Sequence, residues 1–178
     1  MQKIICHACC AVCLMFPLQK LRSLELEPIV YFYNPNIYPS EEYERRFNEL
    51  ERYCNKNSIE LVHEVDSQDV WNEAVKGLEQ EPEKGKRCEV CFRLRLEKTA
   101  QYAKQRNIPF ITTTLTVSPH KNSKMIFNIL DEISQKYEIE YLKCDFKKEN
   151  GFLITNQIAA QENFYRQKYC GCKYSIRT

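Results

Sequence analysis

The segment that decides the fold is Lys3-Ile4-Ile5-Cys6-His7-Ala8, with Cys9-Cys10 directly after it. A short run that is apolar at successive positions is typical of a strand that is buried on both faces. Strands of this kind belong to parallel sheets that helices cover on both sides. Ligands of such sheets bind beyond the carboxyl ends of the strands, so the two cysteines mark a candidate site.

Further along the chain, strand-like and helix-like segments alternate. Four more apolar, β-forming runs are expected to be strands: residues 28–33, 59–65, 109–115 and 139–144. Helices are expected after Ser40, at 70–78, at 88–106, after Ser118-Pro119 and at about 152–164. Strands separated by helices form βαβ units with right-handed crossovers. The sequence therefore predicts an α/β fold: one domain, residues 1–178, with a mostly parallel twisted sheet flanked by helices and a C-terminal helix followed by a cysteine-bearing tail.

The helix after Ser40 has the clearest pattern. Ser40 is expected to be its N-cap, with Glu41 and Glu42 in the first turn, where the helix dipole favours negative charge. Apolar residues follow at helical spacing: Tyr43, Phe47, Leu50 and Cys54. Because Cys54 lies on this stripe, we interpret it as a small core residue rather than part of a site.

Composition limits the class of protein. The chain has 178 residues, of which 43% are hydrophobic and 28% charged, so it suits one folded domain and excludes a disordered or collagen-like chain. A net charge of +2 neither requires nor excludes a nucleic acid. The uncharged, largely apolar stretch at residues 4–18 is too short to span a bilayer and too polar for a signal peptide. We therefore expect a cytoplasmic protein without a membrane partner.

The ten cysteines are the unusual feature of the composition. In a reducing compartment thiols stay free unless they bind metal or carry out redox chemistry. Eight of them fall into three groups: Cys6, Cys9, Cys10 and Cys13; Cys88 and Cys91; Cys170 and Cys172. Clusters at three distant places are expected of a site that folding assembles.

The pair Cys88-x-x-Cys91 lies at the start of a predicted helix. Residues three apart there share one face, and the helix dipole with Arg87 and Arg95 is expected to favour thiolates. Together with Cys9-Cys10, this pair supplies four thiolates, the set that Zn²⁺ or a [4Fe–4S] cluster takes.

A working cluster is favoured over a structural zinc, because both pairs should lie at the ligand-binding edge of the sheet. Cys6 is expected to be buried packing inside the strand. Cys13 is either a spare ligand or a ligand of a second metal near the cluster.

The C-terminal Cys170-Gly171-Cys172 differs in character. Glycine accepts the backbone that a tight disulfide ring between these cysteines needs, and a strained disulfide is readily reduced. Two further metal ligands are the alternative. Aromatic and basic residues surround the pair: Tyr165, Arg166, Gln167, Lys168, Tyr169, Lys173, Tyr174 and Arg177. Stacking and phosphate contacts of this kind hold single-stranded RNA, although a solvated tail has a similar composition.

Six segments match one known family in order. They are HACCAVC at 7–13, YNPNIYP at 33–39, EYERR at 42–46, RCEVCFRLRL at 87–96, TTTLTVSPHKN at 112–122 and YRQKYCGC at 165–172. With them the chain resembles the epoxyqueuosine reductases of the QueH type from residue 4 to its C-terminus. Val12 departs from the family, which usually has proline after the alanine.

The resemblance implies the reduction of epoxyqueuosine to queuosine at the wobble position of certain tRNAs, the last step in making that base. It implies an α/β fold of the HUP class and a redox-active pair formed by Cys170 and Cys172. It also implies a [4Fe–4S] cluster whose matching ligands are Cys9, Cys10, Cys88 and Cys91.

This reaction removes oxygen as water and consumes two electrons and two protons, so tRNA and an unidentified electron donor are the expected partners. A cluster passes single electrons, whereas a dithiol holds two. An additional iron held by Cys13 and the terminal cysteines is a hypothesis that the sequence permits. Two other functions stay open: a zinc-stabilised RNA-binding module without catalysis, and a thiol-disulfide oxidoreductase acting on proteins.

Overall fold

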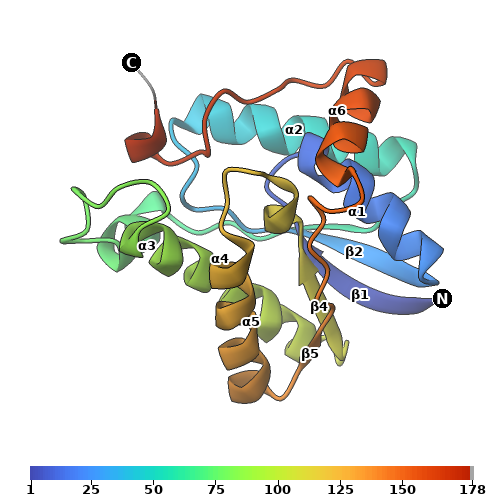
Figure 1. Ribbon diagram of the computed structural model, residues 1–178, viewed down its shortest axis with the longest axis horizontal. Coiled ribbons are helices and arrows are strands. Elements are labelled where there is room, and N and C mark those ends of the chain that lie inside the picture. Colours follow the sequence, from blue (N-terminus) through green and yellow to red (C-terminus); the bar gives the residue numbers. More distant parts are fainter. Residues whose placement is uncertain (177–178) are drawn as a thin grey trace.

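Five parallel strands form one sheet in the order β3-β2-β1-β4-β5 in the computed structural model, which describes residues 1–176 (Figure 1). The strands are β1 (Gln2–His7), β2 (Leu26–Phe32), β3 (Leu61–His63), β4 (Phe110–Thr113) and β5 (Glu140–Tyr141). The predicted parallel α/β sheet is confirmed. The strands at the two ends of the sheet, β3 and β5, are shorter than the predicted runs 59–65 and 139–144.

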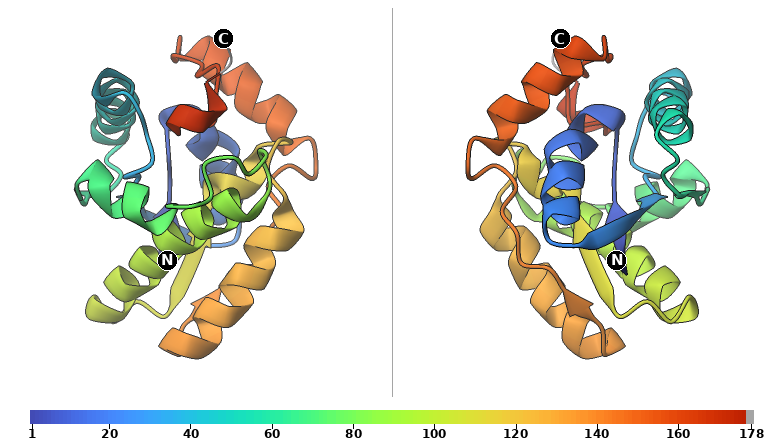
Figure 2. Two further views of the ribbon diagram at one scale, coloured as in Figure 1. Left: turned by 90° about the vertical axis from the view of Figure 1, so that its left-hand side faces the viewer. Right: turned by 90° about the vertical axis from the view of Figure 1, so that its right-hand side faces the viewer.

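Helices cover both faces of the sheet (Figure 2). They are α1 (Ala11–Ser23), α2 (Ser40–Lys56), α3 (Gln68–Ala74), α4 (Lys86–Gln105), α5 (Ser123–Tyr137) and α6 (Gly151–Gln161), with the 3-10 turns η1 (Thr114–Val117) and η2 (Lys173–Ser175). One core cluster joins α1, α2 and α6 to the sheet, and the other joins α4 and α5 to its opposite face. Among the described residues, no helix has the length and apolar character that crossing a bilayer requires.

Strand β1 is buried on both faces, as its composition predicts. Ile4 and Cys6 pack into the first cluster, whereas Ile5 between them packs into the second, because successive side chains of a strand point to opposite faces. Cys6 is therefore core packing, as expected, and the same holds for Cys54, which α2 contributes to the first cluster.

Two predicted helix starts are wrong. Ser40 is the first residue of α2 and not its N-cap, because Pro39 takes that position and its carbonyl accepts hydrogen bonds from Glu42 N and Tyr43 N. The helix expected after Ser118-Pro119 begins only at Ser123, where the side chain of Asn122 caps the backbone N–H of Met125 at 3.2 Å. Residues 118–122 thus form a turn at the edge of the sheet.

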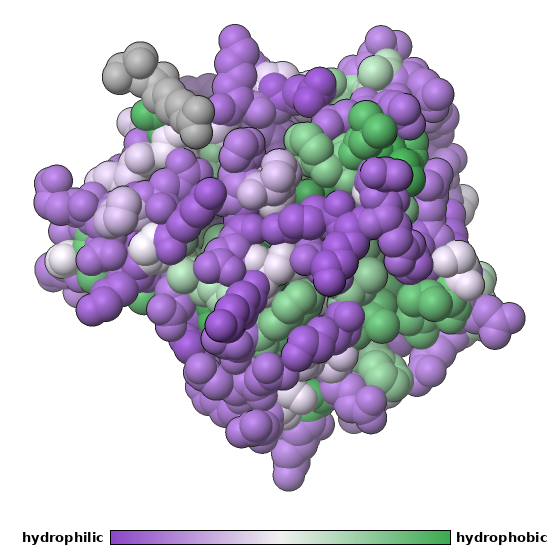
Figure 3. Space-filling model, in the orientation of Figure 1, coloured by the Kyte–Doolittle hydropathy of each residue, from purple (hydrophilic) through white to green (hydrophobic). Residues whose placement is uncertain are grey.

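Helix α6 packs unusually close to α1. A Cβ atom at Gly151, the first residue of α6, would lie 1.9 Å from the carbonyl oxygen of Phe146 and 2.5 Å from the ring of Phe16 on α1. Only glycine fits there, so this residue sets the approach of α6 to α1. The face seen in Figure 3 is mainly hydrophilic, and an apolar area lies over α6, where Phe152 and Leu153 are exposed.

His7 ends β1 as a fully buried side chain. Its Nδ1 lies 3.1 Å from Thr113 Oγ1, and its Nε2 lies 3.3 Å from the carbonyl oxygen of Tyr33. Burial, with a smaller contribution from the charge of Arg95, lowers the pKa of His7 from 6.5 to about 3. The folded protein therefore holds this imidazole neutral at pH values where an exposed histidine is charged.

We predict that acid destabilises the metal-free protein through His7. Below pH 6.5 the unfolded chain binds a proton that the folded protein does not, so stability present above pH 6.5 is lost as the pH falls toward about 3. The free energy of unfolding should fall by up to about 1.4 kcal/mol per pH unit in this range. Urea unfolding of wild type and His7→Gln between pH 7 and pH 4.5 measures the difference. Parallel pH profiles for the two proteins would contradict the assignment.

Candidate metal and redox site

Three cysteine thiols converge where the central strand β1 ends. Cys9 and Cys10 form the turn between β1 and α1, and Cys13 follows in the first turn of the helix. The three sulfur atoms lie within 4.8 Å of one another, all three residues are buried, and the sulfurs of Cys9 and Cys10 are 3.9 Å apart. We call these residues the cysteine triad. Within residues 1–176 the triad is the only group of three or more potential metal ligands this close together.

The triad thiols do not ionise equally. Hydrogen bonds with Cys10 and then Cys13 lower the pKa of Cys9 well below its usual value, against the effect of burial. The same contacts, together with burial, raise the pKa of Cys13 well above its usual value. Cys9 is therefore the triad thiol that loses its proton most readily, and the thiolate is the form that binds metal.

Cys88 and Cys91 lie in the first turns of α4, as predicted, but outside the triad. They share the lining of a small cavity of about 20 Å³ with Cys170 and Cys172. Burial raises the pKa of Cys91 to about 11 and also raises that of Cys88, so the expected preference for thiolates at this helix start is wrong for the metal-free protein. Desolvation of the thiols outweighs the helix dipole and the nearby arginine.

Arg95 on α4 is a buried cation beside these thiols. It is 1% exposed, its Nε donates to the carbonyl oxygen of Cys91 at 3.2 Å, and its Nη1 lies 3.4 Å from Asn34 Oδ1. Its Nη2 has no hydrogen-bond partner among the described residues. Burial acts to lower the pKa of Arg95, but Cys91 and then Cys170 and Cys9 outweigh it and raise the pKa. A buried, partly unpaired guanidinium between two groups of thiols fits a site whose occupant is negatively charged.

A second cation, Lys121, lies in the turn before α5. It lines a cavity of about 250 Å³ together with Cys13, Thr155, Arg166 and Cys170. Burial acts to lower the pKa of Lys121, whereas Cys170 and then Cys9 and Cys13 raise it above its ordinary value. The ammonium group therefore stays charged at a cavity wall that also contains the thiols.

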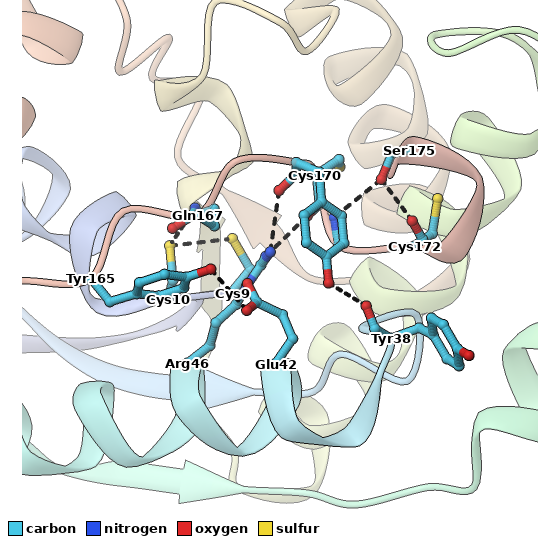
Figure 4. Close-up of polar contacts among 12 residues, drawn as sticks. Cys9, Cys10, Tyr38, Glu42, Arg46, Tyr165, Gln167, Cys170, Cys172 and Ser175 are labelled. Atoms are coloured by element: carbon cyan, nitrogen blue, oxygen red, sulfur yellow. Dashed lines mark hydrogen bonds and ion pairs between the residues drawn. The ribbon is translucent and has the colours of Figure 1, made fainter. Parts of the chain in front are cut away.

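The segment after α6, which we call the tail (residues 162–176), runs back to the triad (Figure 4). Gln167 Nε2 lies 3.1 Å from the sulfur of Cys10 and 3.8 Å from that of Cys13. Cys170 is half-buried and Cys172 is buried, and both thiols are free. The fold thus brings the C-terminal cysteines, separated by more than 150 residues from the triad, to the same edge of the sheet.

Two charged residues of α2, Glu42 and Arg46, hold this tail, and both are buried. Neither residue was expected at the site, since charged residues on a helix with an apolar stripe are expected to face solvent. Two sequence signals include them: the matching segment EYERR at 42–46 and the i,i+4 spacing of opposite charges. Lys121 was also missed, because its turn was expected to be helical.

The expected basic patch of the tail is divided. Arg166 and Lys168 line the 250 Å³ cavity, whereas Lys173 points to α3, where its Nζ lies 3.2 Å from Asn72 Oδ1. Arg177, the last member of the predicted group, lies outside the described residues.

Comparison with known proteins identifies relatives along the whole chain. The family model described as epoxyqueuosine reductase QueH matches residues 4–178. Proteins named epoxyqueuosine reductase QueH are 39% identical in Streptococcus pyogenes serotype M1, 36% in Haemophilus influenzae and 35% in Thermotoga maritima. These alignments cover 98%, 98% and 99% of this chain and 70%, 72% and 91% of the relatives.

A solved structure shares the fold. It is described as a predicted subunit of tRNA methyltransferase from Methanocaldococcus jannaschii, and it superposes with a TM-score of 0.63 at 11% identity, over 90% of this chain and 75% of that one. The likeness shows the fold alone, and it agrees with the expected parallel α/β architecture.

Proposed function

This chain belongs to the epoxyqueuosine reductase QueH family, and we propose from this premise how its cysteines reduce epoxyqueuosine to queuosine in tRNA. The activity makes the chain an oxidoreductase of the last step of queuosine synthesis. The observation that carries the mechanism is the meeting of the triad, the C-terminal cysteine pair and a polar cavity at one edge of the sheet.

The proposed cofactor is a [4Fe–4S] cluster, with Cys9, Cys10, Cys88 and Cys91 as its ligands. The buried, metal-binding geometry of the triad supports a metal, and the unpaired Nη2 of Arg95 supports an occupant of negative charge, which a cluster with four thiolate ligands has. When bound, such a cluster supplies electrons one at a time. Cys13 is the triad member left for an additional iron.

Cys170 and Cys172 are the proposed two-electron carriers. Both C–O bonds of the epoxide break, a C=C bond forms, and the oxygen leaves as water with two protons. The two electrons and two protons come from the dithiol, which becomes a disulfide. An unidentified electron donor must then reduce this disulfide to complete the cycle.

The 250 Å³ cavity is the proposed place of the substrate nucleoside, since Cys13 and Cys170 both line it. Lys121 keeps a positive charge at its wall, where the charge stabilises the oxygen as the C–O bonds break. Arg166 and Lys168 at the same cavity suit the phosphates of the anticodon loop. We treat residues 1–178 as one catalytic domain, and its free thiols fit the reducing cytoplasm.

Metal analysis and an assay of disulfide exchange separate the cluster-containing reductase from the two other functions. Anaerobically purified protein with about four irons and matching sulfide per chain supports the cluster, whereas stoichiometric zinc supports an RNA-binding module. A protein without metal that exchanges disulfides with other proteins would instead support the thiol-disulfide oxidoreductase.

We predict that Cys88→Ser loses the cluster and the reductase activity while the domain stays folded, because one of four ligands is removed. Iron and sulfide analysis, with circular dichroism to check folding, measures the effect. Cys54→Ala is the matched control: it removes a buried thiol from the α2 core, should lower the free energy of unfolding by only about 1–2 kcal/mol, and should keep its iron. Full iron content in Cys88→Ser would show that the ligand set is wrong.

We predict that Cys172→Ser keeps the absorption spectrum of the cluster and tRNA binding but does not turn over, because a single thiol cannot deliver both electrons and close the disulfide. Mass spectrometry of the wild-type tail peptide should show a two-dalton difference between its oxidised and reduced forms. A lowered iron count in the variant would instead assign these sulfurs as metal ligands. Normal turnover would contradict both roles.

We predict that replacing Arg166 and Lys168 by alanine weakens tRNA binding and flattens its dependence on salt, since each lost phosphate contact lowers the slope of log K against log salt by about 0.7. Filter binding at several salt concentrations measures the slope, and the cluster spectrum should not change. Lys173→Ala is the control at the α3 end of the tail and should change the slope less. Equal slopes for the double variant and wild type would move the RNA contact elsewhere.

A further inference from the structure

Cys170 and Cys172 lie on a segment that contains no strand and no long helix. Contacts with the rest of the protein must therefore hold this segment in place. Residues 162–172 make their contacts mainly to α2 and to the loop before it (Figure 4). The backbone N–H of Tyr38 donates to the carbonyl oxygen of Gly171 at 2.9 Å, and the backbone N–H of Tyr165 donates to Glu49 at 2.8 Å. Between these two contacts lies a single buried cation, Arg46.

The guanidinium of Arg46 donates three hydrogen bonds, one from each of its nitrogen atoms. Nε donates to Glu42 Oε1 at 2.8 Å, Nη1 donates to the carbonyl oxygen of Cys170 at 3.0 Å, and Nη2 donates to that of Tyr169 at 3.2 Å. The planar group also lies over the ring of Tyr169, with its Cζ 5.4 Å from the ring centroid. Only arginine combines several donors in one fixed plane with a permanent charge.

Glu42 completes this arrangement from the same helix. Its carboxylate neutralises Arg46, and its second oxygen accepts a hydrogen bond from the hydroxyl of Tyr165 at 3.0 Å. Both partners of the ion pair therefore bind the tail, one through backbone carbonyls and one through a tyrosine. A buried guanidinium with this many partners is held in one orientation.

The backbone of the tail at Gly171 lies close to the guanidinium of Arg46. Gly171 has a φ of +138°, and a Cβ atom there would lie 3.3 Å from Arg46 Nη1 and from Asn36 Nδ2. The glycine between the two cysteines therefore serves the approach of the tail to Arg46 as well as its own backbone conformation. The triad lies on the other side of Arg46 (Figure 4), and the charges of Cys10 and Cys9 act to raise the pKa of Arg46 against the effect of burial.

We propose that Arg46 is the positioning residue of the redox pair: with Glu42 it fixes the backbone at Cys170 and so holds Cys170 and Cys172 against the triad side of the site. This inference rests on the proposed redox role of the two cysteines. Without the guanidinium the pair would remain in the chain but would leave its place beside the cavity and the triad. Substrate tRNA would still bind through Arg166, because its hydrogen bond to Asn156 on α6 (2.9 Å) and the contact of Tyr165 with Glu49 do not involve Arg46.

The test uses two reporters that the tail itself provides. Cys172 is 8% exposed, and its burial depends on the docked tail. Trp71 on α3 is the only tryptophan of the chain; it packs in one cluster with Cys172, and its ring lies 6.1 Å from that of Tyr174. Alkylation of Cys172 and the emission of Trp71 therefore both report whether the tail is docked, without any need for turnover.

The first variant is Arg46→Lys in the anaerobically purified, reduced holoenzyme, because lysine keeps the charge but cannot donate to all three acceptors. The alkylation rate of Cys172, measured by peptide mass spectrometry relative to Cys144 in the same molecule, should rise by about tenfold or more, as expected when charge-assisted hydrogen bonds are lost. Trp71 emission should shift to longer wavelength. The kcat should fall while KM for tRNA stays within about twofold.

Two further variants test whether the effect comes from the hydrogen bonds of Arg46. Arg45→Gln removes the neighbouring charge on α2, whose guanidinium stacks over Tyr165 at 4.7 Å without a hydrogen bond to the tail backbone, and it should leave Cys172 protected. If Arg46→Lys fails to fold, the double variant Glu42→Leu/Arg46→Met removes both charges together, which buried ion pairs often tolerate. It should also expose Cys172.

The proposal would be overturned if both Arg46→Lys and the double variant protected Cys172 as well as the wild type does and left the emission of Trp71 unchanged. The tail would then be held by other contacts. The failure of the redox role is a separate result: in that case Cys172→Ser still turns over, although Arg46→Lys exposes the tail. An inactive Cys172→Ser with a fully docked Arg46→Lys would refute the positioning role alone.

Discussion

The central position of β1 determines where everything else in the site must lie. From β1 the sheet continues to β2 and β3 on one side and to β4 and β5 on the other, so the crossover helices leave in opposite directions. At such a switch point the ends of neighbouring strands leave a crevice that no helix fills. Cys9 and Cys10 occupy the end of β1, and η1 with the turn that contains Lys121 follows β4. The α4 cysteines and the tail reach the site only because this crevice is open.

The site also combines buried positive charges with thiols that can become negatively charged. Arg46, Arg87, Arg95 and Lys121 are cations close to the thiols, and the three arginines are almost completely buried. Arg46 has Glu42 as its partner, but Arg95 has no carboxylate partner among its hydrogen bonds in the described part of the chain. Thiols that ionise or bind metal supply the missing negative charge. The cations thus favour the metal-bound form of a site in which burial raises the pKa of Cys88 and Cys91.

Much of this could be predicted from the sequence, and the failures have definite causes. Apolar runs predicted the strands, and the stripe that contains Cys54 predicted one face of α2, since burial leaves a periodic pattern. Motif matches named the cysteines and placed Cys13 near the predicted cluster, and the structure brings it together with Cys9 and Cys10. The contact of Arg46 with the tail was not predicted. Its acceptors are backbone carbonyls more than 120 residues away, and a local sequence pattern carries no information about such contacts.

The tail contacts also bear on how a metal would reach the triad. Gln167 meets Cys10 across 157 residues of chain, so a growing polypeptide makes this contact only after the segment that follows α6 has been synthesised. The sheet can assemble around β1 while the tail is still unmade. During that interval Gln167 does not yet cover Cys10 and Cys13, so a metal would reach these thiols more directly than in the folded protein.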